Sequence, residues 1–290
     1  MTASTIMVGI TGISGYVGSF IAGRLRQASL DCVGLVRRPE LGDRRYALDA
    51  AVPEGALDNI DTLVHCAWDM RAASWSEAVE VNVEGTRRLL AAASAAGVKR
   101  FVFISSMSAF EGCQSVYGKS KLAAERAVLD ADGIVVRPGL IYGDLPGGIT
   151  GALAQLARKL PVLPMIGTGR FRLHPCHEDD LAELILYICT HDMPVGGVFT
   201  AAQRDGCEFR DIVQAVAGRS LVFIPVPWQL AWAALRSAEA IGLRTRLKSD
   251  SLLGLVKSDP SPDFSMTAQL PVTFRYMNTM NPIGKSGKLL

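Results

Sequence analysis

The 290-residue sequence predicts an α/β fold, a doubly wound parallel sheet with a smaller C-terminal substrate domain. Over the first half of the chain, short β-branched runs alternate with longer helical patterns, which is typical of strand–helix–strand units in a parallel sheet. A glycine-rich loop joins the first predicted strand to the first helix. After residue 143 the pattern changes to loops rich in proline and glycine, followed by short helices.

The predicted strands are short and apolar, and they are Ile6–Ile10, Cys32–Val36, Asp61–His65, Arg100–Ile104 and Ile134–Arg137. The third of these is almost continuously apolar, as expected for a strand that is buried on both faces. Helices are predicted at Tyr16–Ala28, Trp75–Ala96 and Tyr117–Asp130, and Gly97 is a natural stop for the second. We therefore expect a nucleotide domain over 1–143 with a returning segment near 173–200, and a smaller domain made of 144–172 and 201–290.

Composition excludes several classes of function. The 30 basic and 28 acidic residues are well mixed, so no basic stripe indicates nucleic acid. The six cysteines are scattered without a CxxC pair, which argues against a disulfide framework or a metal site and favours a reducing cytoplasm. No signal peptide is recognised, and no stretch reaches the ~20 apolar residues that span a bilayer.

The best membrane candidate is Val226–Leu243, which contains Trp228 and Trp232. Arg236 and Glu239 interrupt it. We favour an amphipathic helix packed on the protein's own core or on a partner subunit over a membrane segment.

The glycine-rich loop, residues 11–18, predicts dinucleotide binding. Gly12 permits a sharp turn, Gly15 lets the backbone approach a pyrophosphate, and Gly18 lets the helix pack close to the strand. The N–H groups and the dipole at the helix N-terminus would then attract the phosphates. This position within the first strand–helix unit is that of a Rossmann-type fold, which weighs against a merely structural turn.

The second strand ends without an acidic residue. NAD-binding folds place a carboxylate there for the ribose 2′-hydroxyl, whereas this strand is followed by Arg37 and Arg38. Guanidinium groups pair well with a phosphate, so we favour NADP over NAD. The alternative is that both arginines are solvated loop cations.

Tyr117 and Lys121 lie one turn apart at the start of a predicted helix. A nearby ammonium favours the phenolate and so brings the pKa of a tyrosine closer to the working pH. The preceding strand ends at Ser105-Ser106, where a hydroxyl can bind the substrate oxygen that Tyr117 protonates or deprotonates.

At these residues the sequence resembles the extended short-chain dehydrogenase/reductases, which include NAD(P)-dependent nucleotide-sugar epimerases and dehydratases. The resemblance spans roughly the whole chain and is strongest over the first half. It rests on the loop at 11–18, the Tyr117–Lys121 motif, the strand and loop at 61–67, a helical asparagine at 82, the strand and loop at 137–143, and the returning segment at 172–182.

The resemblance assigns roles to individual residues. It implies that Ser106, Tyr117 and Lys121 are catalytic, with Ser105 and Ser108 as alternatives for the serine, and that Asn82 supports the lysine through water. The cofactor contacts it implies, together with the loop, are Gly12, Ser14, Gly15, Tyr16, Val17, Gly18, Arg37, Arg38, Cys66, Ala67, Asn82, Ser105, Tyr117, Lys121, Pro138, Gly139 and Ile141. The expected substrate contacts are Trp68, Ser106, Ser108, Arg170 and Arg172, the two arginines being placed to hold a diphosphate. A homodimer through the helices at 75–96 and 117–130 is implied as well.

Two features depart from the family. Only ten residues separate Ser106 from Tyr117, where nucleotide-sugar enzymes insert a longer loop. Met107-Ser108 replaces the Asp-Glu pair with which sugar dehydratases expel water, so dehydration is disfavoured. His174 and His177 are expected to bridge domains rather than to catalyse, and Cys113 to be structural.

The leading hypothesis is hydride transfer on a sugar carbinol, giving epimerisation or net oxidation and reduction, with a nucleotide sugar as substrate. The runner-up is an NADP-dependent ketone or aldehyde reductase on a non-sugar substrate, favoured by Arg37, Arg38 and the short segment after Ser106. A non-catalytic dinucleotide sensor is the third, and the complete Ser106, Tyr117 and Lys121 set argues against it.

Overall fold

The computed structural model describes residues 6–72, 74–144, 147–160, 162–243, 245 and 247–277. The chain divides into two compact units, each of which is made of three segments. Unit 1 consists of Met1–Pro138, Glu178–Ala201 and Asp259–Thr273, and unit 2 of Gly139–His177, Ala202–Ser258 and Phe274–Leu290.

Unit 1 contains a seven-stranded parallel sheet in the order β11-β6-β5-β4-β1-β2-β3. The strand order reverses between β1 and β4, and in such sheets this switch point is where ligands bind. The predicted doubly wound α/β fold is confirmed. The strands are β1 (Met7–Thr11), β2 (Asp31–Val36), β3 (Arg44–Arg45), β4 (Thr62–His65), β5 (Arg100–Ile104), β6 (Ile134–Pro138) and β11 (Val198–Ala201).

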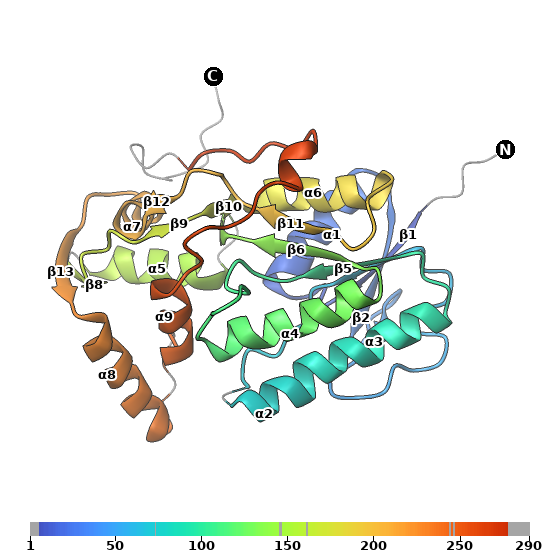
Figure 1. Cartoon of the computed structure of the whole chain (residues 1–290), viewed down its shortest axis with the longest axis horizontal. Helices are drawn as coiled ribbons and strands as arrows, with labels where there is room; N and C mark the ends of the chain where they lie inside the picture. The colour runs from blue at the N-terminus through green and yellow to red at the C-terminus, as the bar shows by residue number, and fades with distance from the viewer. Residues whose placement is uncertain are drawn as a thin grey trace. The chain divides into compact units, whose positions relative to one another are not determined.

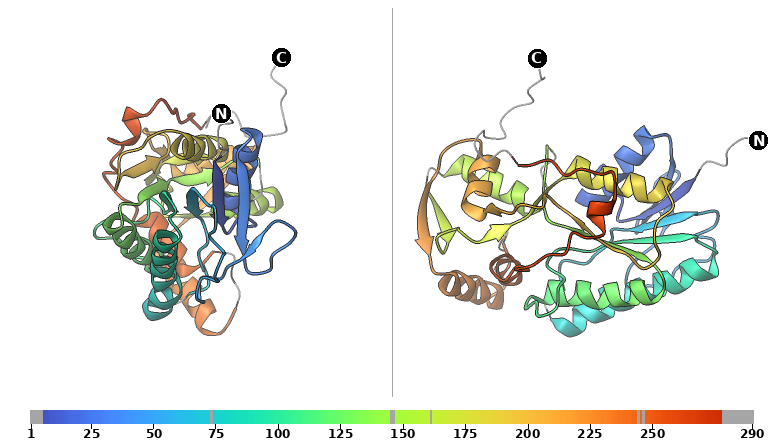
Figure 2. Two further views of the ribbon diagram at one scale, coloured as in Figure 1. Left: turned by 90° about the vertical axis from the view of Figure 1, so that its right-hand side faces the viewer. Right: turned by 45° about the horizontal axis from the view of Figure 1, so that its top comes forward.

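Helices cover both faces of this sheet (Figures 1 and 2). α1 (Tyr16–Gln27) and α6 (Glu178–Thr190) pack together on one face, and α3 (Glu84–Ala95) and α4 (Val116–Asp130) on the other. Three acidic residues occupy the first turn of α6, where they complement the positive end of the helix dipole.

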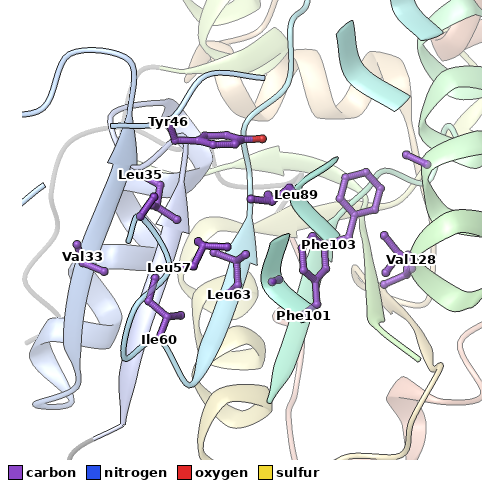
Figure 3. Packing of buried hydrophobic residues seen from close by; sticks show 14 residues of the cluster. Val33, Leu35, Tyr46, Leu57, Ile60, Leu63, Leu89, Phe101, Phe103 and Val128 are labelled. Carbon is purple, nitrogen blue, oxygen red and sulfur yellow. The ribbon is translucent and has the colours of Figure 1, made fainter. Parts of the chain in front are cut away.

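A hydrophobic core lies between the sheet and helices α3 and α4. Figure 3 shows Leu63, Phe101 and Phe103 projecting from β4 and β5 toward Leu89 of α3 and Val128 of α4. Each such side chain contributes about 1.5–3 kcal/mol when it is fully buried. This packing fixes the strand ends and the first turns of the helices, which carry the candidate site.

The segment predicted as one α-helix over Trp75–Ala96 is three elements, so that prediction is wrong in its middle. It consists of α2 (Trp75–Ala78), the π-helix η1 (Val79–Val83) and α3. The extra residue of a π turn re-aims the neighbouring side chains, and such turns are frequent at functional sites. Here it directs Asn82 toward the loop after β4.

Unit 2 has short paired strands and a separate small core. Its helices are α5 (Gly148–Lys159), α7 (Phe209–Ala217), α8 (Trp228–Ala240) and α9 (Ser249–Val256). Its strand pairs are β7 (Leu140–Tyr142) with β10 (Pro175–His177), β9 (Arg172–Leu173) with β12 (Cys207–Glu208), and β8 (Val162–Ile166) with β13 (Val222–Val226).

Two sequence-based expectations need correction here. The smaller domain was expected to hold all of 201–290, yet 259–273, with the short helix η2 (Thr267–Gln269), belongs to unit 1. The Thr200 hydroxyl of β11 donates to the Asp263 carbonyl and fastens this segment beside the sheet. No residue of α8 is buried and its half-buried side contacts α9, so the helix expected over 226–243 does not pack into the protein's own core. Packing on a partner subunit stays a prediction. None of the helices that the structure describes is long and apolar enough to cross a membrane.

Candidate active site

The loop between β1 and α1 has the geometry that a pyrophosphate requires. Gly12 has a φ of +68°, a conformation that favours glycine. A Cβ on Gly18 would lie 2.3 Å from the carbonyl oxygen of Gly12, so helix and turn touch backbone to backbone. In the described structure no side chain caps the first turn of α1 and no acidic residue lies in it. The positive end of this helix therefore suits an anion, and the loop fits a dinucleotide phosphate.

We expect Gly18→Ala to weaken nicotinamide binding at least tenfold and to destabilise the protein by about 1–3 kcal/mol, because the overlap with backbone cannot be relieved by rotating a side chain. Thermal unfolding and fluorescence titration with the cofactor measure the two effects. Gly23→Ala is the matched control, since no atom lies within 4 Å of a Cβ placed there in the same helix. Equal behaviour of the two variants would contradict the close-approach argument.

Positively and negatively charged side chains lie near the end of β2, where the adenosine end of a dinucleotide is expected to bind. Arg37 and Arg38 are exposed directly after the strand. Asp43, from the following loop, lies against Gly34 and Ile13, because a Cβ on Gly34 would lie 2.4 Å from Asp43 Oδ1 and 2.7 Å from Ile13 Cγ2. The sequence analysis missed Asp43, since it searched for a carboxylate only at the strand end.

His65 ties the glycine loop to the loop after β4. The Thr86 hydroxyl donates to the Asn82 carbonyl (2.8 Å), so it accepts from His65 Nε2 (3.1 Å). The other ring nitrogen then accepts from the Thr11 hydroxyl (2.7 Å), which itself accepts from the Ala67 amide (3.1 Å). Burial lowers the pKa of His65 to about 3, so the ring is neutral and this donor order is fixed.

The serine turn after β5 rests on the first turn of α4. A Cβ on Gly118 would lie 2.2 Å from the Ser108 carbonyl oxygen, so only glycine allows this approach. The turn is closed by the Ser108 amide, which donates to Ser106 Oγ (3.1 Å). A side-chain hydrogen bond joins Ser106 to Tyr117 and favours the phenolate. Burial outweighs it and raises the pKa of Tyr117 to about 12.

Lys121 is buried beneath aromatic rings. Its Nζ donates to the Ile104 carbonyl (2.7 Å) and lies 3.8 Å from the ring centroid of Trp68 and 4.6 Å from that of Phe103. Burial lowers the pKa of Lys121 to about 7. The ring faces favour the ammonium form and oppose that shift. Trp68, expected to contact substrate, thus lies over the lysine and edge-on to Tyr117.

Glu125 continues the helix face of Tyr117 and Lys121 by one turn. It is 1% exposed, accepts from the Ser105 hydroxyl, and forms an ion pair with Arg137 in which Nε lies 2.9 Å from Oε1. Because the Ser105 hydroxyl is committed to Glu125, Ser106 is the serine whose hydroxyl lies beside Tyr117. The sequence analysis missed both Glu125 and Arg137, although the spacing of four residues from Lys121 was a visible signal.

Asn82 holds the loop that carries Trp68. The Asp69 amide donates to Asn82 Oδ1 (2.7 Å), and Asn82 Nδ2 donates to the Asp69 carbonyl (3.1 Å). The resemblance implies support of the lysine through water, whereas the contacts seen here act through the loop. Cys66 precedes this loop, and burial raises the pKa of its thiol to about 12, so it is a neutral lining residue.

The match to a family model shows which family the chain belongs to. Residues 8–202 match the NAD dependent epimerase/dehydratase family. The chain belongs to that family. It is therefore an enzyme of a nicotinamide-dependent class, and the sequence-based recognition is confirmed.

Known proteins that resemble the chain have different substrates. It is 33% identical to the ceramide reductase of Caulobacter vibrioides over 80% of this chain and 78% of that protein. It is 25% identical to the UDP-glucose 4-epimerase of Vibrio cholerae over 76% of this chain and 77% of that protein. Among solved structures, MoeE5 in complex with UDP-glucuronic acid and NAD has a TM-score of 0.64 at 21% identity, over 86% of this chain and 96% of that one.

Four more residues that were expected to contact the cofactor lie in unit 1. Pro138 ends β6 and accepts from the Met107 amide (3.0 Å), while Ser14 is exposed in the glycine loop and Tyr16 donates to Glu178 (3.2 Å). Val17 lies in the first turn of α1.

The other candidates belong to unit 2. Gly139 approaches the His174 carbonyl so closely that a Cβ would lie 2.0 Å from it, and Ile141 lies in β7. Arg172 donates to the Gly206 carbonyl, and Arg170 is exposed. His174 is bonded to the Gln203 carbonyl (3.1 Å), and His177 packs edge-on against Tyr142.

Proposed function

We propose that the chain is an NAD(P)-dependent oxidoreductase that interconverts a ketone and a secondary alcohol on an apolar substrate. The observation that carries this proposal is the hydrogen bond between Ser106 and Tyr117 beside the buried Lys121, at the carboxyl end of β5. These are the groups that a proton transfer coupled to hydride transfer needs.

A nicotinamide cofactor held by the glycine loop between β1 and α1 would supply the hydride for the reductive direction. Ser106 holds the carbonyl oxygen by donating a hydrogen bond. Tyr117 gives its phenolic proton to that oxygen, and the charge of Lys121 stabilises the phenolate that remains. In the oxidative direction Tyr117 takes the proton from the carbinol hydroxyl. The pKa of about 12 keeps Tyr117 protonated at neutral pH, which suits reduction.

Two observations support an apolar substrate. The ceramide reductase is the more similar of the two curated relatives, at 33% against 25% identity. Arg172, one of the two arginines expected to hold a diphosphate, already donates to the Gly206 carbonyl. The short segment between Ser106 and Tyr117 agrees with a substrate other than a nucleotide sugar.

The second candidate is epimerisation of a nucleotide sugar. The UDP-glucose 4-epimerase relative and the exposed side chain of Arg170 favour it. The same tyrosine and serine would act, but a ketone formed by oxidation would be reduced again from its other face before release.

Turnover with each substrate class separates the candidates. The full chain is mixed with NADPH or NADH and either a long-chain ketone or UDP-glucose, and nicotinamide absorbance and sugar composition are followed. We expect stoichiometric loss of the reduced cofactor with the long-chain ketone. Interconversion of UDP-glucose without net cofactor consumption, together with no turnover of the ketone, would overturn the apolar assignment.

The choice of cofactor gives a separate prediction. Arg37→Ala with Arg38→Ala is expected to raise KM for NADPH about 10–100-fold, since charge-assisted contacts to the 2′-phosphate are lost, and to leave KM for NADH unchanged. Asp43→Asn is the matched comparison and is expected to raise KM for NADH only. Steady-state kinetics with both cofactors checks this, and an equal rise in both constants for the double variant contradicts a 2′-phosphate role.

A further inference from the structure

The two-stranded parallel sheet of unit 2 exposes an apolar face. Val222 pairs with Val162 and Ile224 with Pro164, and all four are exposed. Val222 is 64% and Ile224 57% exposed, whereas Leu163, between Val162 and Pro164 of β8, is 2% exposed and belongs to the small core. Parallel strands are normally covered on both faces, so this sheet lacks cover on one side among the described residues.

Helix α8 follows β13 directly (Figure 1), and it also exposes large apolar side chains. Its half-buried side, which includes Trp228 and Leu235, lies toward α9. Leu230 and Ile241, which by helical spacing lie on the side of α8 opposite to Trp228, are 64% and 76% exposed. Leu243 beyond the helix is 59% exposed. A surface helix normally buries its apolar stripe, so this one is arranged for an external apolar phase.

The stretch of sequence that contains this helix is basic. The segment 219–257 holds six basic residues and two acidic ones, while the whole chain carries a net charge of only +2. One of the acids, Glu239, accepts from the amide and the hydroxyl of Ser249 (2.7 and 2.6 Å) and is occupied within the protein. Arg244 and Arg246 lie outside the described residues, so only their charge in the sequence enters here.

We propose that this surface binds the plane of an anionic lipid bilayer. We define the lipid-binding face as Val162, Pro164, Val222, Ile224, Leu230, Ile241 and Leu243. Exposed apolar side chains on a helix within a basic stretch of sequence are typical of a helix that lies in a membrane interface. A symmetric contact between two copies would bring two basic segments together, which like-charge repulsion opposes.

Vesicle binding of the full chain tests the proposal. Sedimentation is measured with vesicles of phosphatidylcholine alone and of phosphatidylcholine mixed with phosphatidylglycerol. We expect partitioning at least about tenfold stronger onto the anionic vesicles, reduced by added salt because the basic segment contributes. Leu230→Glu with Ile241→Glu should abolish it without unfolding the protein, since both side chains are exposed.

Leu41→Glu is the matched control, because Leu41 is 107% exposed and belongs to unit 1, whereas every residue of the lipid-binding face belongs to unit 2. The proposal fails if the double variant binds vesicles as well as the wild type. It also fails if neither vesicle is bound and the double variant instead converts a dimer to a monomer in sedimentation velocity, because the occupant is then a second copy. Vesicle binding needs no turnover, so the outcome is independent of the proposed substrate.

Discussion

Tyr117→Phe is expected to lower kcat for ketone reduction by about 10²–10⁴-fold, because it removes the proton donor that lies beside Ser106. Cofactor binding should be retained, since the substitution deletes one hydroxyl and leaves the ring packed edge-on against Trp68. Steady-state kinetics gives the first quantity, and fluorescence titration with the reduced cofactor gives the second.

Tyr46→Phe is the matched control for this variant. Tyr46 is also buried in unit 1, and its hydroxyl has no hydrogen-bond partner among the described residues. Removing that hydroxyl should leave kcat unchanged and stability equal or higher. If Tyr117→Phe keeps most of its activity, Tyr117 is not the proton donor. A biological role that survives the loss of turnover would favour the non-catalytic sensor.

The strand pattern could be read from the sequence because the strands of a parallel sheet are buried on both faces. Thr62–His65, for example, is a continuous run in which every residue is buried. The break at Val79–Val83 could not be predicted, because five residues are too few to reveal the longer repeat of a π-helix and its i→i+5 hydrogen bonds are seen only in the structure. Pairing of two chains through α3 and α4 stays a prediction.

Ser106 could be predicted because it follows the end of a strand. Tyr117 and Lys121 could be predicted because they lie one turn apart on the same helix. Trp68 over Lys121 was not, since residues from β4 and α4 meet only through the tertiary fold. Asp43 was missed for the same reason, because a loop returns it to Gly34 of β2. The exposure of α8 was also unpredictable, since an amphipathic pattern does not say what its apolar stripe faces.

Glu125→Gln is expected to destabilise the protein by about 3 kcal/mol and to shift the pH profile of reduction to lower pH. The stability loss follows from leaving Arg137 without its carboxylate partner, and it lies at the lower end of the usual range because the guanidinium keeps some solvent contact. Chemical denaturation measures the free energy of unfolding. Glu111→Gln, which removes the exposed ion pair between Glu111, before α4, and Arg126 of α4, should not change the free energy of unfolding measurably.

The pH shift has a definite sign. Burial lowers the pKa of Lys121 to about 7, and the negative charges of Cys66 and Glu125 oppose that shift. Because burial raises the pKa of the Cys66 thiol to about 12, that thiol is neutral, and the carboxylate of Glu125, which is ion-paired with Arg137, supplies the opposing charge. Reduction depends on the charged lysine, so kcat/KM should be highest below pH 7 and fall as pH rises through the lysine pKa.

Removing the Glu125 charge lowers the lysine pKa further, so the fall should begin at lower pH in Glu125→Gln than in the wild type. A purely structural role for Glu125 would reduce stability and leave the profile of the remaining folded enzyme in place. A profile that does not move, measured below the unfolding transition, would therefore reject electrostatic tuning of Lys121 while leaving the ion pair as a support for Ser105 and β6. A shift to higher pH would contradict the sign of the interaction itself.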